Sequence, residues 1–380
     1  MIPLAMPNLT GNEKKYLEDC IDTTYVSSVG EYVNRFEKMV ADATGSKYAV
    51  ATSSGTTGLH AALVAVGVKP GDLVIIPTFT FIATANAVAH CGAIPWLMDI
   101  SIDDWCISVE QVKSALADKC RLEEGCCLIH KETGRRVAAI MPVYTLGNIP
   151  DMETITHVVH QYNLPVVADA ACAIGATYKN KPFGGLADVS VLSFNGNKTV
   201  TCGGGGAVVG NDEELLQRIR HLTTTARCGK FYDFDEIGFN YRMTNIQAAV
   251  GCAQMERLDE FVERKREIRS FYQEKLQDVN VSFFPKTDGS SCWFSGILLQ
   301  EGIGFNDVCR ISERLQEKKI EARTFWKPIH MQEPYEDVPR ECVNVSERVW
   351  KRVLSLPCST NLSDDEIKYV VYTLVRLICI

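Results

Sequence analysis

Short runs of consecutive apolar residues recur through the first two thirds of the chain. They lie at residues 49–52, 73–76, 93–97, 137–142, 164–168, 189–194 and 207–210. Because they are continuously apolar rather than alternating, they are typical of strands buried on both faces of a sheet. Helix-like stretches such as residues 58–66 and 84–89 separate many of them. The pattern therefore predicts an α/β fold, with a mostly parallel central sheet and helices on both of its faces.

The pattern changes near residue 250. Residues 244–272 predict one long helix or a bent pair, and strands are expected at residues 282–284, 293–299 and 320–325. Further helices are expected at residues 307–318, 346–353 and 363–377. We therefore predict two domains, a large ligand-binding α/β domain over residues 1–250 and a smaller C-terminal α+β domain over residues 251–380.

Charge and composition narrow the class of protein. The 39 basic and 47 acidic residues give a formal net charge of −8, which argues against binding to nucleic acid. A hydrophobic content of 46% argues against intrinsic disorder. No apolar stretch is long enough to span a bilayer and no signal-peptide pattern is visible, so we expect a cytoplasmic protein away from membranes. The 15 cysteines include no C-x-x-C pair and are expected to be reduced core residues.

Three strand endings carry candidate chemistry, because ligands of open α/β sheets bind beyond the carboxyl ends of strands. After the first run, Gly55 and Thr56 stand at a predicted helix N-terminus that suits a phosphate, although an ordinary serine N-cap with a glycine turn is the commoner reason for such a motif. Asp169 ends another run, where it could meet a metal or a ring nitrogen, or cap the next turn. Lys198 lies in a polar loop before four glycines, where a plain surface lysine is the ordinary interpretation.

Together, these endings match the needs of pyridoxal phosphate. A lysine amine binds the aldehyde as a Schiff base, and a carboxylate keeps the pyridine nitrogen protonated. Hydroxyl groups and a helix N-terminus hold the phosphate. Phe81 is suitably placed along the chain to stack on the ring, and Ser193 could add a hydroxyl at the phosphate.

The same motifs occur in order in one known family. The chain resembles the DegT/DnrJ/EryC1/StrS sugar aminotransferases, a branch of the fold-type I pyridoxal-phosphate enzymes, over nearly its whole length. The likeness runs through residues 24–30, 54–57, 77–87, 169–171, 193–198, 238–249, 328–330 and 356–357. It implies that Lys198 is the Schiff-base lysine and that Asp169 is the partner of the pyridine nitrogen. Gly55, Thr56 and Ser193 would then hold the phosphate, and Phe81 would stack on the ring.

The resemblance also implies a homodimer with shared active sites. Asn240 would reach the phosphate and Arg242 the substrate of the neighbouring subunit. His330 would line the sugar pocket, or else order a proline-containing turn. Two positions depart from the family pattern: Ala168 stands where an acid is usual, and Cys172 where a polar residue often lies near the cofactor's phenolic oxygen.

Residues 193–206 and 235–242 are most similar to enzymes that aminate carbon 4 of UDP-4-keto-6-deoxy-N-acetylhexosamines. We therefore expect transfer of an amino group from glutamate to such a nucleotide-linked keto-sugar by a ping-pong mechanism, with Lys198 carrying the proton. GDP- or dTDP-linked 4-keto or 3-keto sugars are the alternatives. A dehydratase of the same family is less favoured, because such relatives replace the lysine with histidine.

Other classes of protein fit less well. A nucleotide-sugar dehydrogenase needs a G-x-G-x-x-G turn that opens a helix, whereas the glycines at 203–206 precede a predicted strand. A non-catalytic scaffold predicts loss of Lys198 or Asp169, and both are present. His157 and His160 have a metal-compatible spacing but no evident third ligand, so we expect no metal site.

Overall fold

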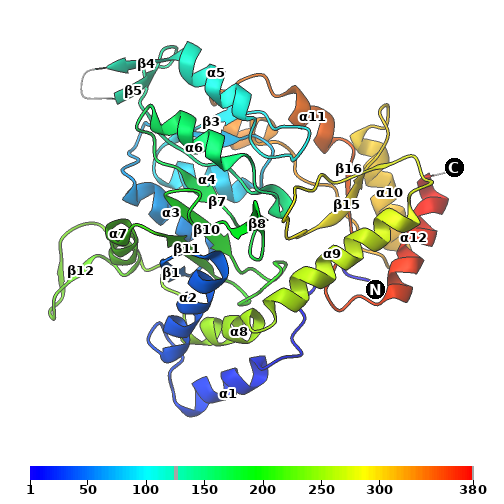
Figure 1. The fold of residues 1–380 in the computed structure, drawn as a ribbon, viewed down its shortest axis with the longest axis horizontal. Coiled ribbons are helices and arrows are strands. Elements are labelled where there is room, and N and C mark those ends of the chain that lie inside the picture. The colour runs from blue at the N-terminus through cyan, green and yellow to red at the C-terminus, as the bar shows by residue number, and fades with distance from the viewer. Residues whose placement is uncertain (124–126, 379–380) are drawn as a thin grey trace.

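A central sheet forms the middle layer of the computed structural model, which describes residues 1–123 and 127–378 (Figure 1). Four strands pair in the order β1 (Tyr48–Thr52), β11 (Gly206–Gly210), β10 (Val189–Ser193) and β7 (Val167–Asp169). Three more pair in the order β3 (Ile94–Met98), β2 (Leu73–Pro77) and β6 (Val137–Ile140). Parallel pairings of Ile140 with Val166 and of Val143 with Asp169 join the two sets through β6 and β7.

The predicted fold class is confirmed at the level of strand direction. β11 runs antiparallel to its neighbours β1 and β10, and the β10–β7, β2–β3 and β2–β6 pairs are parallel. Each strand falls on one of the predicted apolar runs, with ends that differ by up to three residues. The sheet is therefore mostly parallel, as the continuous apolar runs predict.

Helices cover both faces of this sheet. α2 (Glu31–Thr44), α5 (Val109–Lys119), α6 (Met152–His160) and α8 (Asn245–Met255) contribute side chains to the core on one face. α3 (Gly55–Ala65), α4 (Ile82–His90) and α7 (Glu213–Thr223) do so on the other, and α1 (Glu13–Asp22) packs against α8.

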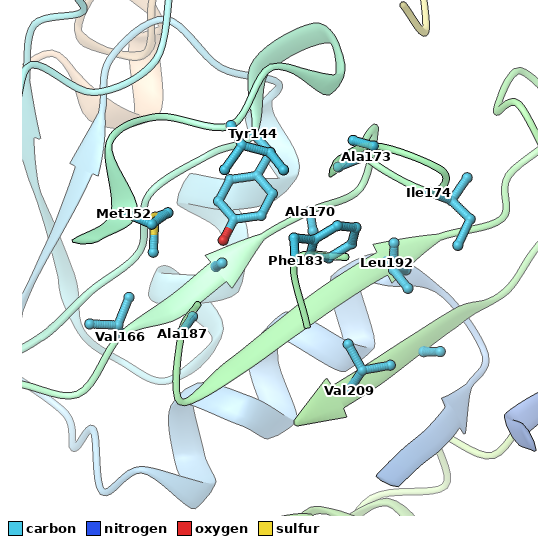
Figure 2. Close-up of a cluster of buried hydrophobic side chains, with 14 of the residues drawn as sticks. Tyr144, Met152, Val166, Ala170, Ala173, Ile174, Phe183, Ala187, Leu192 and Val209 are labelled. Carbon is cyan, nitrogen blue, oxygen red and sulfur yellow. The ribbon is translucent and has the colours of Figure 1, made fainter. Parts of the chain in front are cut away.

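Neighbouring residues of one strand enter opposite cores. On β11, Val208 belongs to the core beneath α3, whereas Val209 belongs to the core beneath α2. Figure 2 shows the latter core, where Tyr144 and Phe183 pack edge to face with ring centroids 5.6 Å apart. Burial on both faces explains why these strands carry no polar alternation.

The C-terminal third packs beside this layer. After α8, α9 (Leu258–Lys275) leads to a small antiparallel sheet of β14 (Ser282–Phe283), β15 (Ser295–Leu298) and β16 (Val353–Leu356). α10 (Phe305–Glu317), α11 (Asn344–Trp350) and α12 (Asp364–Ile378) accompany it. The remaining short elements are the hairpins and 3-10 turns β4 (Cys120–Glu123), β5 (Cys127–His130), β8 (Thr177–Tyr178), β9 (Lys181–Pro182), β12 (Arg227–Cys228), β13 (Asp233–Phe234), η1 (Thr145–Gly147), η2 (Ile329–Met331) and η3 (Glu333–Tyr335).

One expectation for this region is confirmed, one is wrong and one changes in extent. The stretch 244–272 is a pair of helices, one of the two predicted forms, because the helical structure is interrupted between Met255 and Leu258. The strand expected at 320–325 is wrong: Ile320 and Arg323 make only isolated bridges, to Ile2 and Ser355. The helix expected at 346–353 ends at Trp350, and Val353 begins β16. Local apolar pattern alone does not separate a short buried strand from a helix end.

The division at residue 250 stays a prediction. The first residues of the chain nevertheless pack with the C-terminal third, since the N–H of Ile2 donates to the Lys319 carbonyl at 2.7 Å and Leu4 lies in the same core as Val353. Within residues 1–123 and 127–378, no helix has the length and hydropathy needed to cross a membrane.

Candidate active site

The residues predicted to bind the cofactor lie where strands of the central sheet end. Asp169 is the last residue of β7, and Ser193 is the last residue of β10. β1 ends at Thr52, and the chain turns through Ser53 and Ser54 into α3. Because β1, β7 and β10 all run in one direction, these ends meet at the same edge of the sheet.

The start of α3 forms a close-fitting turn beside β10. Ser54 caps the helix: its Oγ accepts from the Thr57 N–H at 3.1 Å, and its own N–H donates to Thr57 Oγ1 at 3.1 Å. The N–H groups of Gly55 and Thr56 open the helix, so the helix itself offers them no carbonyl partner. A Cβ on Gly55 would lie 2.9 Å from Ser193 Cβ. Only glycine therefore lets this turn approach the Ser193 side chain, and the turn can hold an anion.

Asp169 is a buried carboxylate held by the chain itself. Its Oδ2 accepts from Thr84 Oγ1 at 2.7 Å, and its Oδ1 accepts from the Ala171 N–H at 3.1 Å. Burial raises the pKa of Asp169, while these two hydrogen bonds and the positive charge of Lys198 oppose the rise. A cationic partner, such as a protonated ring nitrogen, would stabilise the charged form of this buried carboxylate.

The amine of Lys198 faces the same place. Its Nζ lies 3.3 Å from Cys172 Sγ and 3.9 Å from the centroid of the Trp293 ring. The Trp293 indole N–H donates to the Asn197 carbonyl at 2.8 Å, which fixes the ring next to the lysine loop. Burial raises the pKa of the Cys172 thiol, and the charge of Lys198 opposes that rise.

An amine, a buried carboxylate and an anion-binding turn thus occupy one sheet edge. These are the groups that pyridoxal phosphate requires. Phe81, the N-cap residue of α4, is 57% exposed, so its ring is accessible at this edge.

Asn240 and Arg242 lie on an exposed strand-like segment. Asn240 pairs with Thr224, and Arg242 pairs with Thr52 at the end of β1. In the part of the chain that the structure describes, no hydrogen bond or ion pair joins either side chain to Asp169, Lys198 or Ser193. Their expected contacts with the cofactor and the substrate stay predictions.

His330 lies in η2, next to the end of β2. Its Nδ1 is 2.7 Å from Thr78 Oγ1, and its Nε2 is 3.3 Å from Glu347 Oε1. Burial lowers the pKa of His330, although Glu347 opposes this. Both ring nitrogens are engaged within the chain, which favours the interpretation that His330 orders the turn after Pro328.

Two residues at the site were missed by the sequence analysis. Thr84 is four residues after Thr80 in the first turn of α4, a position from which a hydroxyl could have been expected to reach the sheet edge. Trp293 carried no such signal, because it approaches Lys198 from the distant C-terminal third. His157 and His160 bind separate partners, Gln161 and Asp188.

The fold, and the sheet edge at which Lys198, Asp169 and the Gly55 turn lie, define a fold-type I pyridoxal-phosphate enzyme. The model of the DegT/DnrJ/EryC1/StrS aminotransferase family matches residues 7–375, so the chain belongs to that family. It is a pyridoxal-phosphate-dependent nucleotide-sugar aminotransferase.

Named relatives refine this picture. The chain is 38% identical to GDP-perosamine synthase of Caulobacter vibrioides, over 99% of this chain and 98% of the relative. It is 31% identical to UDP-4-amino-4,6-dideoxy-N-acetyl-beta-L-altrosamine transaminase of Campylobacter jejuni, over 92% of this chain and 90% of the relative. The solved structure of a DegT DnrJ EryC1 StrS aminotransferase from Brucella abortus superposes with a TM-score of 0.87 at 28% identity, covering 97% of this chain and 95% of that one. Of these two relatives, the GDP-perosamine synthase has the higher identity to this chain.

Proposed function

We propose that this chain transfers an amino group from glutamate to carbon 4 of a GDP-linked 4-keto-6-deoxy sugar. The observation that carries the choice of nucleotide is the 38% identity to a GDP-perosamine synthase along almost the full length of both chains. The UDP-linked 4-keto-6-deoxy-N-acetylhexosamine is the second candidate, supported by the 31% identity to the Campylobacter jejuni enzyme.

Pyridoxal phosphate, when bound, supplies an aldehyde that accepts the amino group and a ring that withdraws electrons from the reacting carbon. In our proposal, the Lys198 amine binds that aldehyde and, once released, carries the proton to and from the reacting carbon. Its contacts with the Cys172 thiol and the Trp293 ring support this, since they hold the amine at the sheet edge that also bears Asp169.

The other residues act by holding and orienting. The Asp169 carboxylate, already oriented by Thr84, would pair with the ring nitrogen. Gly55, Thr56 and Ser193 would hold the phosphate, and Phe81 would lie against the ring. Cys172 would adjoin the cofactor close to Lys198. These assignments rest on the shared sheet edge and on the narrow approach at Gly55.

We also propose that the enzyme works as a homodimer with shared sites. Asn240 and Arg242 are exposed and engage no part of the Lys198 site within residues 1–123 and 127–378. A second subunit would bring Asn240 to the phosphate and Arg242 to the substrate. His330 would contribute to the sugar pocket by shaping the turn that borders it.

The test compares the rates of amination of different nucleotide sugars. The holoenzyme is first given glutamate, and then equal concentrations of GDP-, UDP- and dTDP-linked 4-keto-6-deoxy sugars in separate reactions. We expect kcat/KM for the GDP-linked sugar to exceed the others by at least about tenfold, which corresponds to about 1.4 kcal/mol of transition-state discrimination. Faster amination of the UDP-linked N-acetylhexosamine would overturn the choice of nucleotide.

A further inference from the structure

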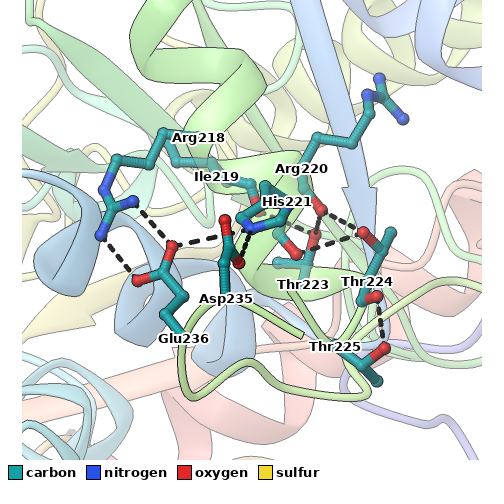
Figure 3. A network of polar contacts seen from close by, with 9 residues as sticks. All are labelled: Arg218, Ile219, Arg220, His221, Thr223, Thr224, Thr225, Asp235 and Glu236. Carbon is teal, nitrogen blue, oxygen red and sulfur yellow. Dashed lines mark hydrogen bonds and ion pairs between the residues drawn. The ribbon is translucent and has the colours of Figure 1, made fainter. Parts of the chain in front are cut away.

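Three metal-binding side chains converge outside the active site, where α7 meets the hairpin β12–β13. His221 comes from the last turn of α7, Cys228 from β12, and Asp235 directly follows β13. One donor atom from each lies within 4.8 Å of the other two. Figure 3 shows His221 and Asp235 pointing toward one another, with His221 Nε2 2.7 Å from Asp235 Oδ1.

The backbone accounts for this convergence. Cys228 pairs with Asp233 across the hairpin. Asp235 follows two residues later and contacts His221 at the end of α7. The Ala226 N–H donates to the His221 carbonyl at 2.9 Å, which ties the start of the hairpin to the end of the helix. The three side chains are therefore placed by regular hydrogen bonding of the main chain.

A fourth possible donor, a carboxylate oxygen, lies nearby. Glu236 Oε1 lies 3.8 Å from His221 Nε2, and its carboxylate is held by two hydrogen bonds from Arg218, at 2.8 and 2.9 Å (Figure 3). The Arg218 contacts account for the position of Glu236, and the His221–Asp235 contact joins those two side chains. Neither accounts for the Cys228 thiol, whose sulfur lies within 4.8 Å of a donor atom of both His221 and Asp235.

Nitrogen, sulfur and oxygen donors together suit zinc. Bonds of about 2.0–2.3 Å to a tetrahedral zinc place its ligand atoms roughly 3.3–3.8 Å from one another. Small side-chain rotations bring donors spaced within 4.8 Å to that separation. We propose that His221, Cys228 and Asp235 form a zinc-type divalent metal site that fastens the hairpin to the end of α7, with Glu236 or water as the fourth ligand.

The position of this site gives it a structural consequence. The hairpin carries the exposed aromatic residues Phe231, Tyr232 and Phe234 and continues into residues 238–242. Within that segment, the Phe239 ring packs against the His60 ring on α3, with the two ring centroids 4.7 Å apart. A metal at His221 and Asp235 would fix the segment that bears Asn240 and Arg242, although no step of amino transfer uses the three ligands.

Cobalt provides a direct probe. The holoenzyme, freed of metal with a chelator, is titrated with Co²⁺, and difference spectra remove the cofactor's own absorption. We expect the visible bands of tetrahedral Co²⁺ and a thiolate-to-cobalt charge-transfer band that saturate together, and added Zn²⁺ should abolish both. Binding should release protons, because the thiol must ionise to bind.

Variants assign the ligands. Cys228→Ser should lose the charge-transfer band, and His221→Gln and Asp235→Asn should each weaken binding at least about tenfold, the loss that even indirect partners of a zinc ion produce. Cys342→Ser, which removes another cysteine outside the core, should bind cobalt as the parent does. The cofactor absorption of each variant reports that it has folded. A parent protein without these bands, or a Cys228→Ser variant that keeps the charge-transfer band, overturns the proposal.

Discussion

At the scale of single residues, the buried carboxylate of Asp169 depends on donors supplied by its own chain. Thr84 and the Ala171 N–H are its hydrogen-bond donors, and burial still raises its pKa. Thr80 Oγ1 lies 2.9 Å from Thr84 Oγ1, so the hydroxyl that donates to Asp169 is itself held in place. Thr84 is therefore expected to act as a positioning residue for Asp169.

We predict that Thr84→Val lowers kcat for amino transfer about tenfold or more, because a hydrogen bond to a charged group contributes about 1.5–3 kcal/mol. The pH at which the bound cofactor changes its absorption should also shift. Thr156→Val is the matched control, since the Thr156 hydroxyl donates only within α6, to the Met152 carbonyl at 2.7 Å. Equal kcat values for the two variants would show that Thr84 does not orient Asp169.

His330 makes stability depend on pH. Burial lowers its pKa in the folded protein, against opposing effects of Glu347 and Asp99, while Arg340 acts in the same direction as burial. The neutral imidazole is thus favoured in the folded state. The contribution of His330 to the free energy of unfolding is present above the ordinary histidine pKa of about 6.5. It is lost as the pH falls through the lower pKa of the folded state.

We therefore predict that His330→Gln loses less stability than the parent protein between about pH 7 and pH 5. Urea unfolding of both proteins at each pH measures the difference. His157→Gln is the matched control for the substitution, because His157 is exposed on α6. An identical pH dependence in His330→Gln would refute the assignment.

At the scale of elements, α11 is capped by a residue that lies far from it in the sequence. Asp99, which follows β3, accepts from the N–H groups of Val345 and Ser346, each at 2.8 Å, and from the Ser346 hydroxyl. Val343, the N-cap residue of α11, provides no side-chain cap. One buried carboxylate therefore joins the central sheet to the C-terminal third.

Loss of the Asp99 cap should lower the stability of the folded protein. We predict that Asp99→Ala lowers the free energy of unfolding by about 2–3 kcal/mol, because buried N–H groups lose their acceptor. The neighbouring variant Asp103→Ala, on the exposed side of the same turn, should change it by less than about 0.5 kcal/mol. Chemical denaturation gives both values, and similar losses in the two variants would argue against a cap that joins the two parts.

The same elements show what sequence can predict. Strand positions such as residues 73–76 and 189–194 were predictable, because burial on both faces leaves continuous apolar runs. The positions of Asp169 at the end of one such strand and of Lys198 in the loop after another were predictable for the same reason, whereas their roles stay predictions. Trp293 and the Asp99 cap join residues about a hundred or more positions apart, and no local pattern encodes such a contact. Within residues 320–325, Ile320 and Ala322 are buried, although the segment forms no strand.

At the scale of the whole molecule, the proposed shared site can be tested by mixing subunits. Lys198→Ala and Arg242→Ala should each be nearly inactive as homodimers. In a mixed dimer one site carries both substitutions and the other carries neither, so random mixing should restore roughly a quarter of the parental activity. Activity that stays at the level of the separate variants would show that Lys198 and Arg242 serve the same subunit's site.

The central claim is that Lys198 holds the cofactor at the edge where Asp169 and the Gly55 turn meet. Borohydride reduction of the holoenzyme makes the bond between lysine and cofactor permanent, and mass spectrometry of the digested protein then locates it. The account predicts a pyridoxyl group on the peptide that contains Lys198, and none after Lys198→Ala. A stoichiometric pyridoxyl group on any other lysine, Lys265 included, would contradict it.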